Sequence, residues 1–410
     1  MQRLVFPLVA RLAGRTFNNL SRTSPRPDAP LYALRGKYTV GTRDFQIPDR
    51  KRPLRCAMWY PAQNPERKEQ LATYFEGAAH FIGHALRNAH PASEAAPFPL
   101  VIFSHGSGGV RFQSLYLTEH LASHGFVVMG VDHTGNTIFD GILSPEKYEV
   151  NRIRNYIQRP SDILRQIAFA EELTAADGDM PGLIDMNRIA VTGHSFGGYS
   201  ALAAAGACLN FDALNAWCAD PANVELDSGA LGSVCYLRHH VELFAEQRGL
   251  TRIPSGLWEP TTDPRIRAVV AMAPWNAPIF GKEGLQQLKI PALVMVGSAD
   301  PVTIPERDAY PVYEYLGSSS KYLMVLENAG HFIFVDECSE LLRRFDMFDI
   351  CSDKVWDMAR AHDLINHMIT AFLLAKIDND PVAEEALAPD AVNYRAVRYR
   401  VSECEPDSNG

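Results

Sequence analysis

Residues 188–198 read RIAVTGHSFGG, and they carry the pattern that decides the fold. The apolar run RIAVT leads directly into Gly193-His194-Ser195-Phe196-Gly197, and the small residues SALAAAGA follow. A G-x-S-x-G motif between a strand and a helix is typical of a sharp turn that exposes a serine hydroxyl. The glycines are expected because side chains at either position would collide with neighbouring backbone. The stretch therefore predicts a nucleophile, Ser195, rather than a glycine-rich turn without chemistry.

Short apolar runs alternate with helical segments through most of the chain, which favours an α/β fold with a mostly parallel sheet flanked by helices. We expect one domain over residues 35–377, a basic tail at 1–34 and a C-terminal tail at 378–410. The first two strands are expected to be antiparallel. The predicted strands are 37–47, 54–60, 99–104, 126–131, 188–192, 268–273, 292–296 and 322–326, and the predicted helices are 115–124, 161–175 and 355–374.

Two regions depart from this alternation of apolar runs and helical segments. Residues 66–96 form an excursion near the start, and residues 208–264 are longer than ordinary connections in such sheets. An insertion after the helix that follows Ser195 is expected to lie over the carboxyl edge of the sheet, where ligands bind in open α/β folds. We interpret residues 208–264 as a cap, and its apolar side chains are expected to line the entrance to the site: Phe211, Leu214, Trp217 and Phe244.

A serine nucleophile needs a base and an acid, which on this fold follow it in the order serine, acid, histidine. His331 comes after the last predicted parallel strand, in the sequence ENAGHF, and is the predicted base. Asp300 follows an apolar strand in VGSADP and is the predicted acid. The alternative for Asp300 is a turn aspartate before proline. Its rivals for the role are Asp220 and Asp227 in the cap and, closest to the histidine in sequence, Asp336.

The loop FSHGSGG at residues 103–109 has the composition expected of an oxyanion hole. We expect the backbone N–H groups of Ser107 and Phe196 to donate to the developing oxyanion. A phosphate cradle would need a Walker lysine, which the loop lacks. Other candidates for substrate contact are Gly106, His194 and Trp275, although Trp275 is equally well explained as a core side chain.

The charge and hydrophobicity of the chain argue against some classes of protein. Lys and Arg total 39 against 48 Asp and Glu, a formal net charge of −9, which argues against a nucleic-acid binder. The arginine-rich first 60 residues fit a solvated or targeting tail, or else contact with an anionic membrane surface. No run is long and apolar enough for an integral membrane segment.

No cysteine spacing suggests structural zinc, so a structural metal is not expected. Cys338 and Cys351 flank a loop and, with the cysteines near residue 218, allow either disulfides or buried thiols. A periplasmic or secreted protein is slightly favoured over a cytoplasmic one, and the oligomeric state stays open.

Four segments in order, PLVIFSHGSGG, LASHGFVVMGVDHTGN, RIAVTGHSFGGYS and AGHFIF, resemble the platelet-activating-factor acetylhydrolase and dienelactone hydrolase-like families. The stretch from MAPWN to the histidine is also similar to cutinase-like polyester hydrolases. The resemblance implies an α/β-hydrolase fold and hydrolysis of small or lipid-like esters without a cofactor. Acetylhydrolases of the plasma type carry the acid one strand earlier, where this chain has Ala273-Pro274-Trp275, which favours Asp300 instead.

The function expected from these features is a serine carboxylic ester hydrolase that forms an acyl-enzyme on Ser195. The alternative within enzymes is a phospholipase A2-like acetylhydrolase or a polyester hydrolase with the same triad. The alternative from another class is a binding protein on a hydrolase scaffold without catalysis.

Overall fold

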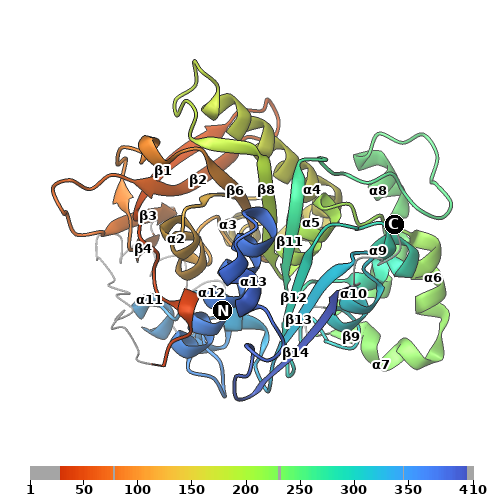
Figure 1. Ribbon diagram of the computed structural model, residues 1–410. Helices are drawn as coiled ribbons and strands as arrows, with labels where there is room; N and C mark the ends of the chain where they lie inside the picture. Colours follow the sequence, from red (N-terminus) through yellow and green to blue (C-terminus); the bar gives the residue numbers. More distant parts are fainter. Residues whose placement is uncertain (1–27, 77–78, 230–231, 345, 404–410) are drawn as a thin grey trace, which may run out of the picture.

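The computed structural model of the chain describes residues 28–76, 79–229, 232–344 and 346–403. The strands of its main sheet are β1 (Thr39–Ile47), β2 (Leu54–Ala62), β5 (Leu86–Arg87), β6 (Phe98–Ser104), β7 (Val127–Val131), β8 (Ile184–His194), β11 (Ile266–Met272), β12 (Ala292–Gly297), β13 (Ser320–Leu326) and β14 (Val397–Glu403). Within the described residues these form one ten-stranded sheet in the order β14-β13-β12-β11-β8-β6-β7-β2-β1-β5 (Figure 1).

The strands from β13 to β7 run parallel to one another, whereas β14 pairs antiparallel with β13, β2 with β7, and β1 with β2. The α-helices are α2 (Leu115–Ser123), α3 (Ile138–Leu143), α4 (Pro145–Thr174), α5 (Phe196–Ala204), α6 (Phe211–Ala219), α7 (Val224–Asp227), α8 (Val241–Gln247), α9 (Gly281–Gln286), α10 (Ala309–Tyr315), α11 (Glu340–Arg344), α12 (Met358–Ile377) and α13 (Pro381–Ala386). The expected fold class is confirmed, and the antiparallel start is present.

The sheet separates two hydrophobic cores. Along β12, Val294 and Val296 belong to the core that also contains residues of α4 and α5, while Leu293 and Met295 belong to the core that contains residues of α2 and α12. Successive side chains of a strand point to opposite faces, so a strand covered on both sides must be apolar at every position. This explains why the central strands read as continuous apolar runs.

The boundaries differ from the sequence-based expectation at the C-terminus. Residues 378–410 are expected to be a tail, but residues 381–386 form α13 and residues 397–403 form β14, which pairs with β13 along its whole length. Up to residue 403 the segment therefore belongs to the domain. The alternation of charged and apolar residues in VRYRVSE fits an edge strand that buries one face, a signal too short to stand out in the sequence.

Most of the expected basic tail, residues 1–27, lies outside the described residues. Residues 31–33 form the short 3₁₀-helix η1, and the Tyr32 ring stacks on His367 of α12 at 5.8 Å between centroids. The excursion at 66–96 forms a hairpin of β3 (Ala72–Glu76) and β4 (Ala79–Gly83), then β5 and the 3₁₀-helix η2 (Ser93–Ala95).

The segment 208–264 contains α6, α7 and α8, the 3₁₀-helices η3 (Pro221–Asn223) and η4 (Val234–His240), and the two-residue strands β9 (Ser228–Gly229) and β10 (Gly232–Ser233). A disulfide between Cys218 and Cys235 joins α6 to η4. The expectation that its apolar side chains line an entrance is wrong for Phe211, Leu214 and Phe244, which are buried in the core shared with α4 and α5. In that core these side chains bury more of their apolar surface than they would at an entrance that faces solvent.

Candidate active site

Ser195 lies on the turn between the last residue of β8, His194, and the first residue of α5, Phe196. Its backbone has φ +59° and ψ −119°, a region that non-glycine residues rarely adopt. The turn is closed by hydrogen bonds from the Ser195 N–H to the Met272 carbonyl at 2.9 Å and from the Trp275 N–H to the Ser195 carbonyl at 3.2 Å. The backbone beside β11 therefore holds the serine in a strained conformation.

The glycines on either side of the serine are required by the close approach of backbone atoms. A Cβ atom at Gly197 would overlap the carbonyl oxygen of Ser104, and one at Gly193 would overlap the carbonyl oxygen of Gly197. Neither clash can be relieved by a side-chain rotation, because both obstacles are backbone. The collision expected from the motif is confirmed at both positions.

Asp300 and His331 form a buried pair at the carboxyl ends of β12 and β13. The Nδ1 atom of His331 lies 2.7 Å from Oδ2 of Asp300, and the side chains are 3 % and 0 % exposed. His331 is the first residue of the 3₁₀-helix η6 (His331–Phe334). With Asp300 accepting at Nδ1, the Nε2 atom is the one left to exchange a proton with a substrate or nucleophile.

The loop after β12 holds the Asp300 carboxylate in place. Its Oδ1 accepts from the N–H groups of Val302 at 2.8 Å and Thr303 at 2.9 Å, and its Oδ2 accepts from the Thr303 hydroxyl at 2.6 Å. Burial alone would raise the pKa of this carboxyl, but the His331 charge and the hydrogen bonds from His331 and Thr303 outweigh it and lower the pKa. Asp300 therefore stays ionised beside the imidazole.

His194 brings the Asp300–His331 pair next to Ser195. The Nε2 atom of His194 is 3.0 Å from the backbone carbonyl of His331, and the two rings are 4.6 Å apart. Within the part of the chain that the structure describes, the contacts include no hydrogen bond between the Ser195 hydroxyl and the His331 ring.

The loop after β6 approaches the same serine. A Cβ atom at Gly106 would lie 3.5 Å from Cβ of Ser195, so the loop backbone is against the nucleophile. The N–H groups of Gly106, Gly108 and Gly109 donate to the Gln113 side chain, the Asn136 carbonyl and the Gly106 carbonyl. Among the described contacts the Ser107 N–H has no such partner. Phe196 opens α5, so its N–H has no acceptor within the helix.

The model of the alpha/beta hydrolase family matches residues 101–344, more than half of the chain. The chain is an alpha/beta hydrolase. A second family model, described as platelet-activating factor acetylhydrolase, isoform II, matches residues 25–157.

The hydrolase is similar to platelet-activating factor acetylhydrolases of three mammals. It is 26 % identical to the protein of Cavia porcellus over 218 residues, which cover 40 % of this chain and 49 % of the relative. It is 25 % identical to the protein of Canis lupus familiaris over 239 residues, or 44 % and 54 % of the two chains, and 30 % identical to that of Bos taurus over 120 residues, or 24 % and 27 %. The hydrolase thus spans about half the length of these relatives, or less.

None of the rival acids contacts His331 in the hydrolase. Asp336 accepts from the N–H groups of Leu115 at 3.0 Å and Tyr116 at 2.9 Å, at the start of α2. Asp220 and Asp227 accept from backbone N–H groups within residues 208–264. Each of these carboxylates satisfies orphan donors at a helix start or a turn, a role that sequence patterns do not separate from catalysis.

Of the other predicted contact residues, His194 supports the site through its hydrogen bonds, whereas Trp275 is a core side chain that borders the site. His194 is buried, its Nδ1 lies 3.2 Å from Nε2 of Gln113 and its Nε2 faces the His331 carbonyl, so neither nitrogen is free for a substrate. Burial, and then the charge of His331, lowers its pKa to about 3, which keeps it neutral. Trp275 is 4 % exposed, and its ring meets Phe196 edge-on at 5.2 Å, so it is a core side chain that also borders the site.

Sequence reasoning missed three residues that support the site. Gln113 joins the Gly106 N–H to His194, Thr303 holds Asp300, and Arg159 of α4 binds the loop after β6. None lies in a recognisable motif. Among the described residues no group of three or more His, Cys, Asp or Glu side chains is placed to hold a metal ion, and no helix is long and apolar enough to span a membrane.

Proposed function

We propose that this alpha/beta hydrolase is a serine carboxylic ester hydrolase that works through an acyl-enzyme. The observation that carries the proposal is the buried Asp300–His331 hydrogen bond beside the strained turn of Ser195. An ionised carboxylate on Nδ1 orients the imidazole and stabilises its protonated form, so Nε2 is suited to take a proton from the serine.

In the proposed reaction His331 removes the Ser195 proton as Oγ attacks the ester carbonyl carbon. The C=O π bond breaks, and its electron pair becomes the oxyanion, which accepts from the N–H groups of Ser107 and Phe196. The intermediate collapses, the C–O bond to the alcohol breaks, and His331 gives its proton to the leaving alcohol. Water then attacks the acyl-enzyme by the same route, which releases the acid and restores Ser195.

Two experiments test this assignment. Fluorophosphonate treatment should add the reagent's phosphonyl mass to the peptide carrying Ser195, and p-nitrophenyl acetate should be turned over. S195A and H331A should each remove most turnover, and the double variant should be little worse, because members of a triad act as a unit. S161A is the matched control: this hydroxyl on α4 only bonds the Ile157 carbonyl at 3.2 Å, so its turnover should stay normal.

Labelling of a residue other than Ser195, or a preparation that binds esters without turning them over, would contradict the proposal. The second result would favour a binding protein on a hydrolase scaffold.

A second candidate is an acetylhydrolase that removes a short acyl chain from a phospholipid. It is favoured by the match of residues 25–157 to the platelet-activating factor acetylhydrolase model and by the names of the relatives. The position of the acid after β12 rather than β11 separates the chain from the plasma type. A panel of p-nitrophenyl esters of rising chain length, a short-chain phospholipid and a polyester film would identify the substrate class, because these substrates differ in the acyl group that is transferred to Ser195 and in the alcohol that leaves the carbonyl carbon.

A further inference from the structure

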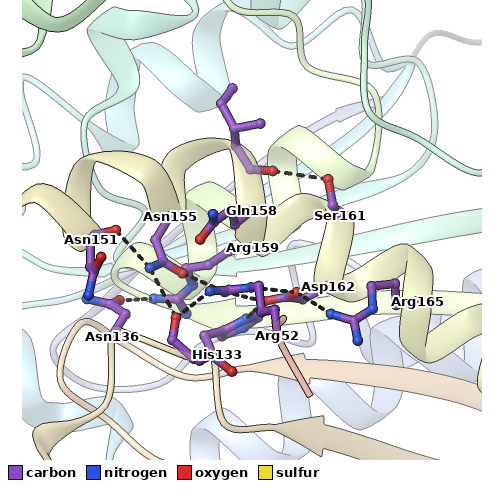
Figure 2. A network of polar contacts seen from close by, with 12 residues as sticks. Arg52, His133, Asn136, Asn151, Asn155, Gln158, Arg159, Ser161, Asp162 and Arg165 are labelled. Carbon is purple, nitrogen blue, oxygen red and sulfur yellow. Dashed lines mark hydrogen bonds and ion pairs between the residues drawn. The ribbon is translucent and has the colours of Figure 1, made fainter. Parts of the chain in front are cut away.

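Arg159 lies in the middle of α4 with its guanidinium fully buried behind the loop after β6. It donates to the Asn136 side-chain oxygen at 2.8 Å, to the Ser104 hydroxyl at 3.1 Å and to the His105 backbone carbonyl. Figure 2 shows it between Asn136 and the group formed by His133, Asp162 and Arg52. Two of its three acceptors are on the segment that continues directly into Gly106 and Ser107.

The same guanidinium also reaches the other side of the proposed oxyanion hole. Its carbon atom is 4.6 Å from the centroid of the Phe196 ring, a cation–π distance. Arg159 therefore contacts both segments that carry the proposed donor N–H groups. It reaches the loop of Ser107 by hydrogen bonds and reaches Phe196 through the ring. A planar fork with five donors can hold both at a fixed separation, which a lysine ammonium cannot.

The buried charge of Arg159 has no direct ion-pair partner among the described residues. Its three hydrogen-bond acceptors are neutral oxygens, and among the described residues no carboxylate lies within 4.0 Å of it, whereas Arg52 pairs with Asp162 at 2.7 Å. The buried Nε atom of Arg159 has no acceptor in the described part of the chain. Burial lowers its pKa to about 9, partly offset by the charge of Asp162, so it remains protonated at neutral pH.

A buried cation without a bound anion is costly to keep. That cost is explained if an anion forms next to it during the reaction.

Behind Arg159 a second layer fixes the Ser104 hydroxyl. Nε2 of His133 lies 2.9 Å from it, and Nδ1 of His133 lies 2.9 Å from Asp162, whose carboxylate also binds Arg52 and Arg165. Arg52 donates to Asp162, Asn155 and the Thr134 carbonyl but makes no contact with the loop after β6 among its described hydrogen bonds. It is therefore a control in the same network: a second, half-buried arginine, one step removed from the donors.

We infer that Arg159 is a positioning residue of the oxyanion hole, which sets the separation of the Ser107 and Phe196 amides and supplies behind them a positive charge that no carboxylate contacts directly among the described residues. This inference rests on the proposed function, since it concerns the anion that forms when Ser195 attacks an ester. It predicts a defect in the transition state rather than in substrate binding.

The experiment compares R159M, R159K and R52M with the wild-type chain. Each is assayed for kcat and KM with p-nitrophenyl acetate, for inhibition by a trifluoromethyl ketone, which adds to serine and forms a stable oxyanion, and for thermal unfolding. R159M should lower kcat by about 10²-fold, the order expected for loss of one oxyanion donor, with KM little changed. Ketone inhibition should weaken in proportion to kcat.

R159K should recover part of the loss, because it restores the charge but not the fork. R52M should unfold at a lower temperature yet keep wild-type kcat.

The inference falls if R159M keeps wild-type kcat, if its loss appears only in KM, or if R52M lowers kcat as much. If R159M does not fold, the kcat and ketone inhibition of R159K against R52M decide the same question. The proposed function fails separately: a wild-type chain with neither turnover nor labelling of Ser195 overturns both, whereas a fully active R159M overturns the inference alone.

Discussion

The hydroxyl of Tyr199 donates a hydrogen bond of 3.0 Å to the backbone carbonyl of Tyr156, at the point where Pro160 interrupts the hydrogen bonding of α4. Proline has no N–H, so the carbonyl four residues earlier loses its partner within the helix. Tyr199 belongs to α5, which starts at the nucleophile. The two helices that carry Ser195 and Arg159 are thereby joined at the position where one of them would otherwise break.

Y199F should lower the free energy of unfolding by about 1–3 kcal/mol, because the buried Tyr156 carbonyl would be left unsatisfied. Urea unfolding measures this. Y60F is the control: its hydroxyl bonds the carbonyl of Ala89 at 2.8 Å, but that residue is half-buried and water can replace the bond. Equal losses in the two variants would mean that the proline site has no special need for Tyr199.

D300N should reduce kcat by about 10⁴-fold, the loss known for the corresponding change in a serine protease triad, because an amide favours the wrong imidazole tautomer. The amide is nearly isosteric, so the folded structure should persist. D336N should cost far less activity, since Asp336 bonds the start of α2 and not His331. Steady-state kinetics decide between them, and the reverse order of damage would remove Asp300 from the triad.

Asp336 should make stability fall as pH rises from about 4 to about 7. Burial, which outweighs its hydrogen bonds from Tyr116 and Leu115, raises the pKa of this carboxyl to about 7. In the unfolded chain an aspartate has a pKa of about 3.9. Between these two pKa values the folded state therefore binds more protons than the unfolded state. The stabilising proton is present below the unfolded pKa and is lost as pH rises through the folded pKa.

The free energy of unfolding of the wild type minus that of D336N should therefore decrease by up to about 1.4 kcal/mol per pH unit in this window. Urea unfolding of both chains at several pH values measures it. A difference that grows with pH would mean that the helix start prefers the charged carboxylate.

Two disulfides, Cys218–Cys235 between α6 and η4 and Cys338–Cys351 after η6, should be present in protein matured under oxidising conditions. Intact mass with and without reduction, after thiol alkylation, should differ by four alkylated cysteines. Replacing Cys338 and Cys351 by alanine should lower the free energy of unfolding by about 2–4 kcal/mol, because the unfolded chain gains freedom. Four reactive thiols at these positions in the unreduced protein would exclude both bridges.

The features that could be predicted from the sequence are local patterns. Ser195, its two glycines and the central strands follow from a turn that tolerates no side chain and from strands buried on both faces, and both constraints leave a recognisable pattern in consecutive residues. His331 followed from chain order, because parallel strands bring their carboxyl ends to one edge of the sheet.

The sequence favoured Asp300 but left Asp336 as a rival, and the tertiary contacts separate them: Asp300 faces the imidazole of His331, whereas Asp336 faces the start of α2. The tertiary structure also decided that β14 closes the sheet and that Arg159 lies behind the loop at Ser107. The physical reason is the same in each case: a buried polar group or an edge strand is stabilised by a partner distant in sequence, and composition and spacing do not record which partner that is.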